Sequence, residues 1–118
     1  MREIKFRAWN YSKMIYNCAI RNGLVVNHKD SFYQIGQETN YPIMQYTGLK
    51  DKNGKEIYEG DIIKVFDNKN GVFKVEFKNQ YVGGWLLCHE KGQVSLGARK
   101  KNDIEVVGNI YQNPELLK

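Results

Sequence analysis

Only a few side chains in this sequence have the chemistry that catalysis or metal binding requires. Cys88 and His89 are sequence neighbours, which on a strand places them on opposite faces, so a thiolate and imidazole pair would need a distant partner such as His28. Zinc ligation by these residues together with Cys18 would lack the short paired spacing of structural sites. We therefore expect neither cysteine to be essential, and we expect no metal or cofactor.

Three carboxylates lie close together in the sequence, at Glu56, Glu59 and Asp61. Clustered oxygen ligands of this kind can hold a divalent cation for phosphodiester hydrolysis, so a weak metal-dependent nuclease is one alternative. Gly60 between two of them also suits a sharp entry into the apolar strand that follows. The sequence has no P-loop, no GxGxxG after a strand and no HExxH, and it favours a protein that is not an enzyme.

The first strand predicts recognition of a polyanion. Lys5, Arg7 and Trp9 alternate with apolar residues at period two, which places two cations and an aromatic ring on one strand face. Proteins that bind single strands use such faces to contact phosphates and to stack bases. The alternative is an ordinary solvated strand whose tryptophan covers the edge of a core.

A second basic cluster follows Gly97. Arg99, Lys100 and Lys101 are consecutive and are expected in a loop, where cations can meet a phosphate backbone. Charged turns are common, so this run alone is weak evidence. The two segments together provide the six candidate residues for nucleic-acid binding.

The overall charge is mildly basic. In 118 residues, 18 Lys and Arg against 13 Asp and Glu give a net charge of +5, which favours nucleic acid over an acidic partner. Fourteen of the cations are lysine, as codon bias in an A+T-rich genome would also produce. The excess lies near the two ends of the chain, with +4 in residues 1–30 and +2 in residues 91–118.

The pattern of apolar residues predicts short strands and no long helix. Residues 4–9 and 14–20 are expected to pair as a hairpin, and the Asn53-Gly54 pair predicts a primed turn in which both residues have positive φ. Residues 21–42 are expected to form a loop with one short strand. Asn113 is expected to cap a one-turn helix. Further strands are expected at residues 43–47, 61–66, 72–78, 85–88 and 104–110.

These strands predict a mainly β fold, with α+β as the alternative, in the form of a small barrel or β-rich domain. Residues that recur at period two on neighbouring strands are expected to share one core. They are Ile63, Val65, Phe73, Val75, Phe77, Val106 and Ile110.

Three separated blocks of the sequence carry a resemblance to a known family. They begin with MREIKFRAW at Met1, with QYTGLKDKNGKEIYEGDI at Gln45 and with VGNIYQNPEL at Val107. In this order they resemble the YopX family of phage and prophage proteins. The resemblance implies a small cytoplasmic protein of a bacterial host with an SH3-like β-barrel in its C-terminal part, and it supplies no catalytic residues.

The prediction is therefore an N-terminal β-hairpin subdomain at residues 1–47 and an SH3-like barrel at residues 48–118. The expected function is a non-catalytic module that binds nucleic acid weakly and without sequence preference. The alternatives are a module that binds a phage or host protein or assembles with itself into a homo-oligomer, and the nuclease. No apolar run approaches the roughly 18 residues of a membrane span, so we expect a soluble protein with no membrane partner.

Overall fold

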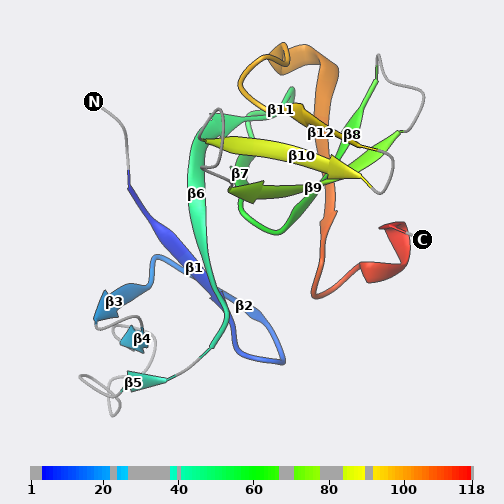
Figure 1. The fold of residues 1–118 in the computed structure, drawn as a ribbon. Helices are drawn as coiled ribbons and strands as arrows, with labels where there is room; N and C mark the ends of the chain where they lie inside the picture. The colour runs from blue at the N-terminus through cyan, green and yellow to red at the C-terminus, as the bar shows by residue number, and fades with distance from the viewer. Residues whose placement is uncertain are drawn as a thin grey trace. The chain divides into compact units, whose positions relative to one another are not determined.

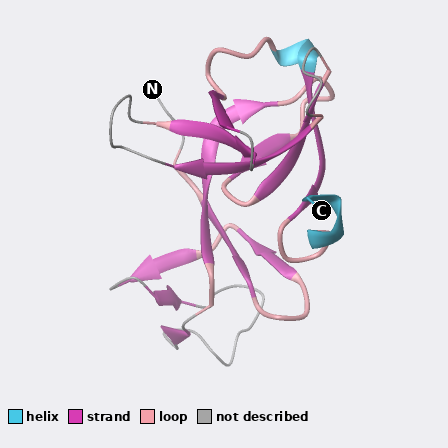
Figure 2. Ribbon diagram, turned by 45° about the vertical axis from the view of Figure 1, so that its right-hand side comes forward, coloured by secondary structure: helices cyan, strands magenta, loops and turns pink. Residues whose placement is uncertain are grey.

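The computed structural model describes most of the chain, and strands predominate in it (Figure 1). The helical segments that it describes are short 3-10 turns (Figure 2). The mainly β class predicted from the sequence is therefore confirmed. The described residues are 4–21, 24–26, 38–39, 41–66, 71–77, 84–89 and 92–117.

The chain divides into two compact units, Met1–Tyr46 and Thr47–Lys118. The sequence placed this boundary between residues 47 and 48. Unit 1 holds β1 to β5 and the first half of β6: β1 Phe6–Trp9, β2 Met14–Tyr16, β3 Ala19–Arg21, β4 Leu24–Val26, β5 Glu38–Thr39 and β6 Ile43–Lys50. Unit 2 holds the rest: β7 Glu56–Tyr58, β8 Asp61–Val65, β9 Val72–Phe77, β10 Trp85–His89, β11 Gly92–Ser95, η2 Lys101–Asp103, β12 Ile104–Asn109 and η3 Pro114–Leu117.

In unit 1, β1 is a central strand that pairs antiparallel with β2 and with the start of β6. The predicted four-residue loop joins β1 to β2, and Asn10 stabilises it by accepting hydrogen bonds from the backbone N–H groups of Ser12 and Lys13. The strand predicted for residues 14–20 ends at Tyr16. Asn17 has a φ of 58°, which is incompatible with a β-strand. A second sheet, β3-β4-β5, includes one strand more than the sequence predicted for residues 21–42.

Unit 2 contains a five-stranded antiparallel sheet in the order β11-β10-β9-β8-β12. Four strands follow one another as a meander, and the last strand returns through the turn η2 to pair with the first, β8. The sheet curls as half of a barrel does (Figure 1).

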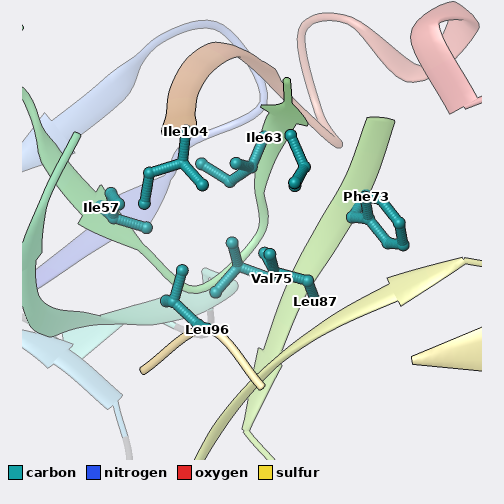
Figure 3. Close-up of a cluster of buried hydrophobic side chains, with 8 residues drawn as sticks. Ile57, Ile63, Phe73, Val75, Leu87, Leu96 and Ile104 are labelled. Carbon is teal, nitrogen blue, oxygen red and sulfur yellow. The ribbon is translucent and has the colours of Figure 1, made fainter. Parts of the chain in front are cut away.

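The core of unit 2 lies inside this curled sheet, where apolar side chains from five strands and one loop point toward one another (Figure 3). Four of the predicted core residues, Ile63, Val65, Phe73 and Val75 on β8 and β9, are almost fully buried. Trp85, Val94 and Val106 pack against the cluster and are partly buried. The cluster consists of Ile57, Ile63, Val65, Phe73, Val75, Leu87, Leu96 and Ile104.

Two of the predicted core residues lie elsewhere. Phe77 keeps 50% of its surface exposed, because it ends β9 beyond the layer of buried side chains and contacts Trp85 edge-on at 5.0 Å between ring centroids. Ile110 follows a register shift in β12 between Val106 and Gly108, and it is not part of the core cluster. A bulge adds a residue and changes which side chains point inward, so the simple alternation failed after Val106.

The turn at residues 51–55 differs from the predicted primed turn. Gly54 has a φ of 80°, but Asn53 does not have positive φ. The backbone N–H of Gly54 donates to the Asp51 carbonyl, and that of Asp51 donates to the Lys55 carbonyl, as in a three-residue hairpin loop with glycine at its left-handed position.

Gly60 has a φ of 87° at the entry to β8, as the sequence predicted. At the other end of unit 2, the side chain of Asn113 does not act as the expected helix cap. Asn113 directly precedes the predicted one-turn helix, η3, and its backbone carbonyl accepts from the N–H of Leu116, but its side-chain oxygen accepts from the backbone N–H of Asn109 rather than from the helix.

The two half-barrel phenylalanines provide a test of this core. Because Phe73 is fully buried, Phe73→Ala is expected to lower the free energy of unfolding by about 3–5 kcal/mol. Phe77→Ala is expected to cost less than half of that, since half of the ring already contacts water. Urea unfolding followed by tryptophan fluorescence measures both. Equal losses for the two variants would show that Phe77 belongs to the core after all.

Candidate nucleic-acid interface

The first predicted binding segment is not an open strand face. Arg7 is only 2% exposed, and its guanidinium lies 6.0 Å from the centroid of the Tyr16 ring on the neighbouring strand. Its neighbour Ala8, on the opposite face, is fully buried as well. Both faces of β1 are therefore covered at Arg7 and Ala8, and Arg7 does not present the open cation that the predicted binding face requires.

The other two residues of this segment are half-buried. The ammonium group of Lys5 lies 5.0 Å from the centroid of the Tyr46 ring, a cation–π contact within unit 1. The backbone N–H of Trp9 donates to the carbonyl of Pro42. The structure thus holds Lys5 and Trp9 in packed surroundings and leaves Arg7 out of reach of a phosphate backbone.

The second predicted segment is more accessible. Lys100 and Lys101 are exposed, while Arg99 is half-buried. The backbone N–H of Arg99 donates to the carbonyl of Leu96, and that of Asp103 donates to the carbonyl of Lys100, so hydrogen bonds on both sides hold this loop. The loop then becomes η2, which leads directly into β12.

Backbone hydrogen bonds bring the end of η2 beside two distant parts of the chain. The N–H of Phe66 donates to the carbonyl of Asp103 at 2.9 Å, and the N–H of Lys52 donates to the carbonyl of Ile104 at 3.1 Å. The basic loop is therefore only two to three residues along the chain from the backbone that holds Phe66 and Lys52.

Phe66 is the centre of this surface. The residue is 46% exposed, and the ammonium groups of Lys52 and Lys64 lie 4.7 and 5.2 Å from the centroid of its ring. We call the set Lys52, Lys64, Phe66, Lys100 and Lys101 the basic aromatic patch. It combines four cations with an accessible aromatic ring in unit 2, which is the residue combination that binds nucleic-acid strands.

Two carboxylates moderate the charge of the patch. Glu105 lies 4.0 Å from the ammonium of Lys52, accepts a hydrogen bond from the side chain of Asn53, and is the cross-strand partner of Lys64. Asp103 is the second. Four lysines against two carboxylates leave a positive surface, and the half-exposed Glu105 competes with any bound phosphate for Lys52.

Asp51 holds the turn to which Lys52 belongs. Its carboxylate is 1% exposed and accepts three backbone hydrogen bonds, from Asn53 and Lys55 in its own turn and from Val106 on β12. Burial acts to raise the pKa of this carboxyl, but the hydrogen bonds from these three N–H groups, aided by the charge of Lys55, hold the pKa below its usual value. The ionised side chain therefore joins the turn to β12.

The sequence contained part of the signal for this patch. Lys64 lies on β8 and Phe66 directly after it, two residues apart around the core residue Val65, so the alternation places both side chains on the side opposite Val65. Lys52 could not be placed beside them, because its contact depends on how the turn at 51–55 joins β12. Of the six predicted residues, Lys100 and Lys101 are counted in the patch because they are exposed and lie two to three residues before Asp103, whose carbonyl accepts from Phe66.

The carboxylates considered for a metal site serve the local fold. Asp61 is buried and accepts a hydrogen bond from the backbone N–H of Tyr58, while Glu56 accepts one from the hydroxyl of the same tyrosine. Across the part of the chain that the structure describes, no three His, Cys, Asp or Glu side chains gather closely enough to hold a metal ion.

Unit 2 also has an open pocket of about 510 Å³ on the outer side of β9, β10 and β11. Cys88 and His89 both line it, although the sequence placed them on opposite faces. The Cys88 thiol donates to the side-chain oxygen of Gln93 at 3.6 Å, and the His89 ring packs 5.6 Å from the Phe73 ring. His28, the other proposed partner, lies outside the described residues.

The fold and the patch define a small antiparallel β protein of the half-barrel type with a basic aromatic surface. The model of the family described as YopX protein matches residues 5–118, and the chain therefore belongs to the YopX family. No curated protein matches it. Among the described residues, no helix has the length and apolar character needed to cross a membrane.

Two solved structures resemble the whole chain. Protein EF1440 from Enterococcus faecalis is 26% identical, with a TM-score of 0.68 and complete coverage of both chains. Protein yopX from Bacillus subtilis is 24% identical, with a TM-score of 0.56 over all of this chain and 98% of that one. The second likeness concerns the fold alone.

The buried carboxylate of Asp51 predicts a pH dependence of stability. The pKa of Asp51 is lower in the folded chain than in the unfolded chain. The carboxylate therefore stabilises the fold fully when the pH is above the pKa of the unfolded chain, about 4, and this stabilisation is lost as the pH falls through the pKa of the folded chain. Asp51→Asn is expected to be less stable at pH 7 and to lose less stability than the wild type below about pH 4. Urea unfolding at a series of pH values checks this, and parallel curves would contradict it.

Proposed function

We propose that this protein is a non-catalytic module that binds nucleic acid weakly and without strong sequence preference, through the basic aromatic patch of unit 2. The observation that carries the proposal is the half-exposed ring of Phe66 with two lysine ammonium groups about 5 Å from its centroid. In a protein whose net charge is +5, this surface offers both phosphate contacts and a π face.

The chemistry of the patch supports a sequence-independent mode. Lysine ammonium groups contact phosphates as point charges, and such contacts carry no base information. The proposal does not depend on Arg7, which is buried, and it keeps Lys100 and Lys101 from the sequence prediction. We place this activity in the cytoplasm of a phage-carrying bacterial host, as the family resemblance implies.

Association with a phage or host protein, or with a second copy of the chain, is the competing account. The two accounts differ in their response to salt. Binding to phosphates releases the counterions that had been condensed on the nucleic acid, so the affinity falls steeply as the salt concentration rises. Apolar association does not weaken in this way. The salt series therefore decides between them.

The test is a fluorescence-anisotropy titration of labelled DNA at several salt concentrations. The wild type is expected to bind at low salt. The double change Lys100→Gln and Lys101→Gln is expected to flatten the slope of log affinity against log salt by about 0.7 to 0.9 for each phosphate that the protein no longer neutralises.

Lys74→Gln is the matched control. Lys74 is a half-exposed lysine of unit 2 that pairs with Glu76 at 3.1 Å, faces Ile62 across β8 and β9, and is not one of the patch residues. This variant is expected to keep the wild-type slope. Absence of binding at low salt, or equal slopes for all three proteins, would remove the proposal and leave protein association as the leading account.

A further inference from the structure

We infer that the basic aromatic patch selects single-stranded over double-stranded nucleic acid, because Phe66 stacks on an unpaired base. This inference rests on the proposed function and narrows it to one class of ligand. It follows from the position of the ring and from the groups around it.

The ring of Phe66 is accessible without any rearrangement of the core. Phe66 follows β8 directly, and its backbone N–H donates to the carbonyl of Asp103, which fixes the residue at the surface. Its side chain remains 46% exposed, whereas Val65 beside it is buried in the core cluster. The backbone at Phe66, held by this hydrogen bond, thus presents part of the phenyl group to solvent, as stacking platforms require.

The surroundings of the ring suit a nucleotide rather than an apolar partner. The ammonium groups of Lys52 and Lys64 lie 4.7 and 5.2 Å from the ring centroid. A base that stacks on the phenyl group displaces an ammonium from the ring, and the displaced ammonium is then beside the phosphate of the same nucleotide. Stacking of the base and neutralisation of its phosphate charge therefore occur together at one nucleotide.

The same geometry discriminates against duplex. In a base-paired helix the faces of the bases are already stacked on one another, so that only the lysines of the patch can contribute through the phosphates. An unpaired base offers a free face, and stacking tolerates any sequence because every base has such a face. DNA and RNA share this face, so we expect single strands of either to bind.

The experiment compares Phe66→Ala with Phe77→Ala in the whole protein. Both residues are half-exposed phenylalanines of unit 2, at 46% and 50%, but Phe77 contacts Trp85 and has no role in the patch. The probes are labelled oligothymidylate, oligouridylate and a hairpin DNA duplex of equal phosphate number whose loop is a polyether linker without bases, titrated at one low salt concentration. Melting temperatures confirm that both variants are folded.

Wild-type protein is expected to bind both single strands more tightly than the hairpin. Phe66→Ala is expected to weaken single-strand binding by about 5- to 150-fold, the range that corresponds to removal of one aromatic stacking partner, and to change hairpin binding by less than about twofold. Phe66→Tyr is expected to restore single-strand binding, and Phe77→Ala to leave it unchanged.

Two results would overturn the inference in different ways. Equal binding of single strands and hairpin, with no effect of Phe66→Ala, would remove the stacking role while leaving the proposed function in place. Absence of binding to every probe would remove the proposed function and the inference with it.

Discussion

The buried carboxylate of Asp51 is the interaction on which the arrangement of unit 2 depends most. One side chain accepts hydrogen bonds from Asn53, Lys55 and Val106, and thereby joins the turn at 51–55 to β12. A buried carboxylate is costly unless such donors satisfy it, and here they also keep it ionised. Because β12 is the strand that returns to β8, this link connects the turn to the end of the meander.

The patch is a consequence of that link. Lys52 belongs to the turn, Lys64 and Phe66 come from β8 and its end, and the exposed lysines of η2 precede β12. The backbone hydrogen bonds of Phe66 to Asp103 and of Lys52 to Ile104 bring these three sources together. The basic aromatic patch is thus formed from residues 52–101 by contacts that stabilise the fold, and its charge is set by the balance between four lysines and the carboxylates of Asp103 and Glu105.

Alternation was sufficient to predict the class of fold and the inward faces of β8 and β9, because Ile63, Val65, Phe73 and Val75 follow an undisturbed period of two. It failed where the backbone departs from that period or where a strand is covered on both faces. The bulge in β12 places Ile110 outside the core. Arg7 is buried because β1 is a central strand, and the sequence of one strand does not show whether that strand is central. The candidate site was predicted only at Lys100 and Lys101, since the contacts of Phe66 with Lys52 join positions that no local pattern connects.

The most direct test of a positively charged binding surface is to remove the carboxylate that opposes it. Glu105 and Glu76 are equally exposed, at 32% and 33% of their side chains, and each lies beside a lysine, but only Glu105 adjoins the patch. The measurement is the affinity of Glu105→Gln and Glu76→Gln for oligothymidylate at low salt. The account predicts tighter binding for Glu105→Gln than for the wild type and no change for Glu76→Gln, because Lys52 is freed to contact phosphate. Unchanged or weaker binding by a folded Glu105→Gln protein would contradict it.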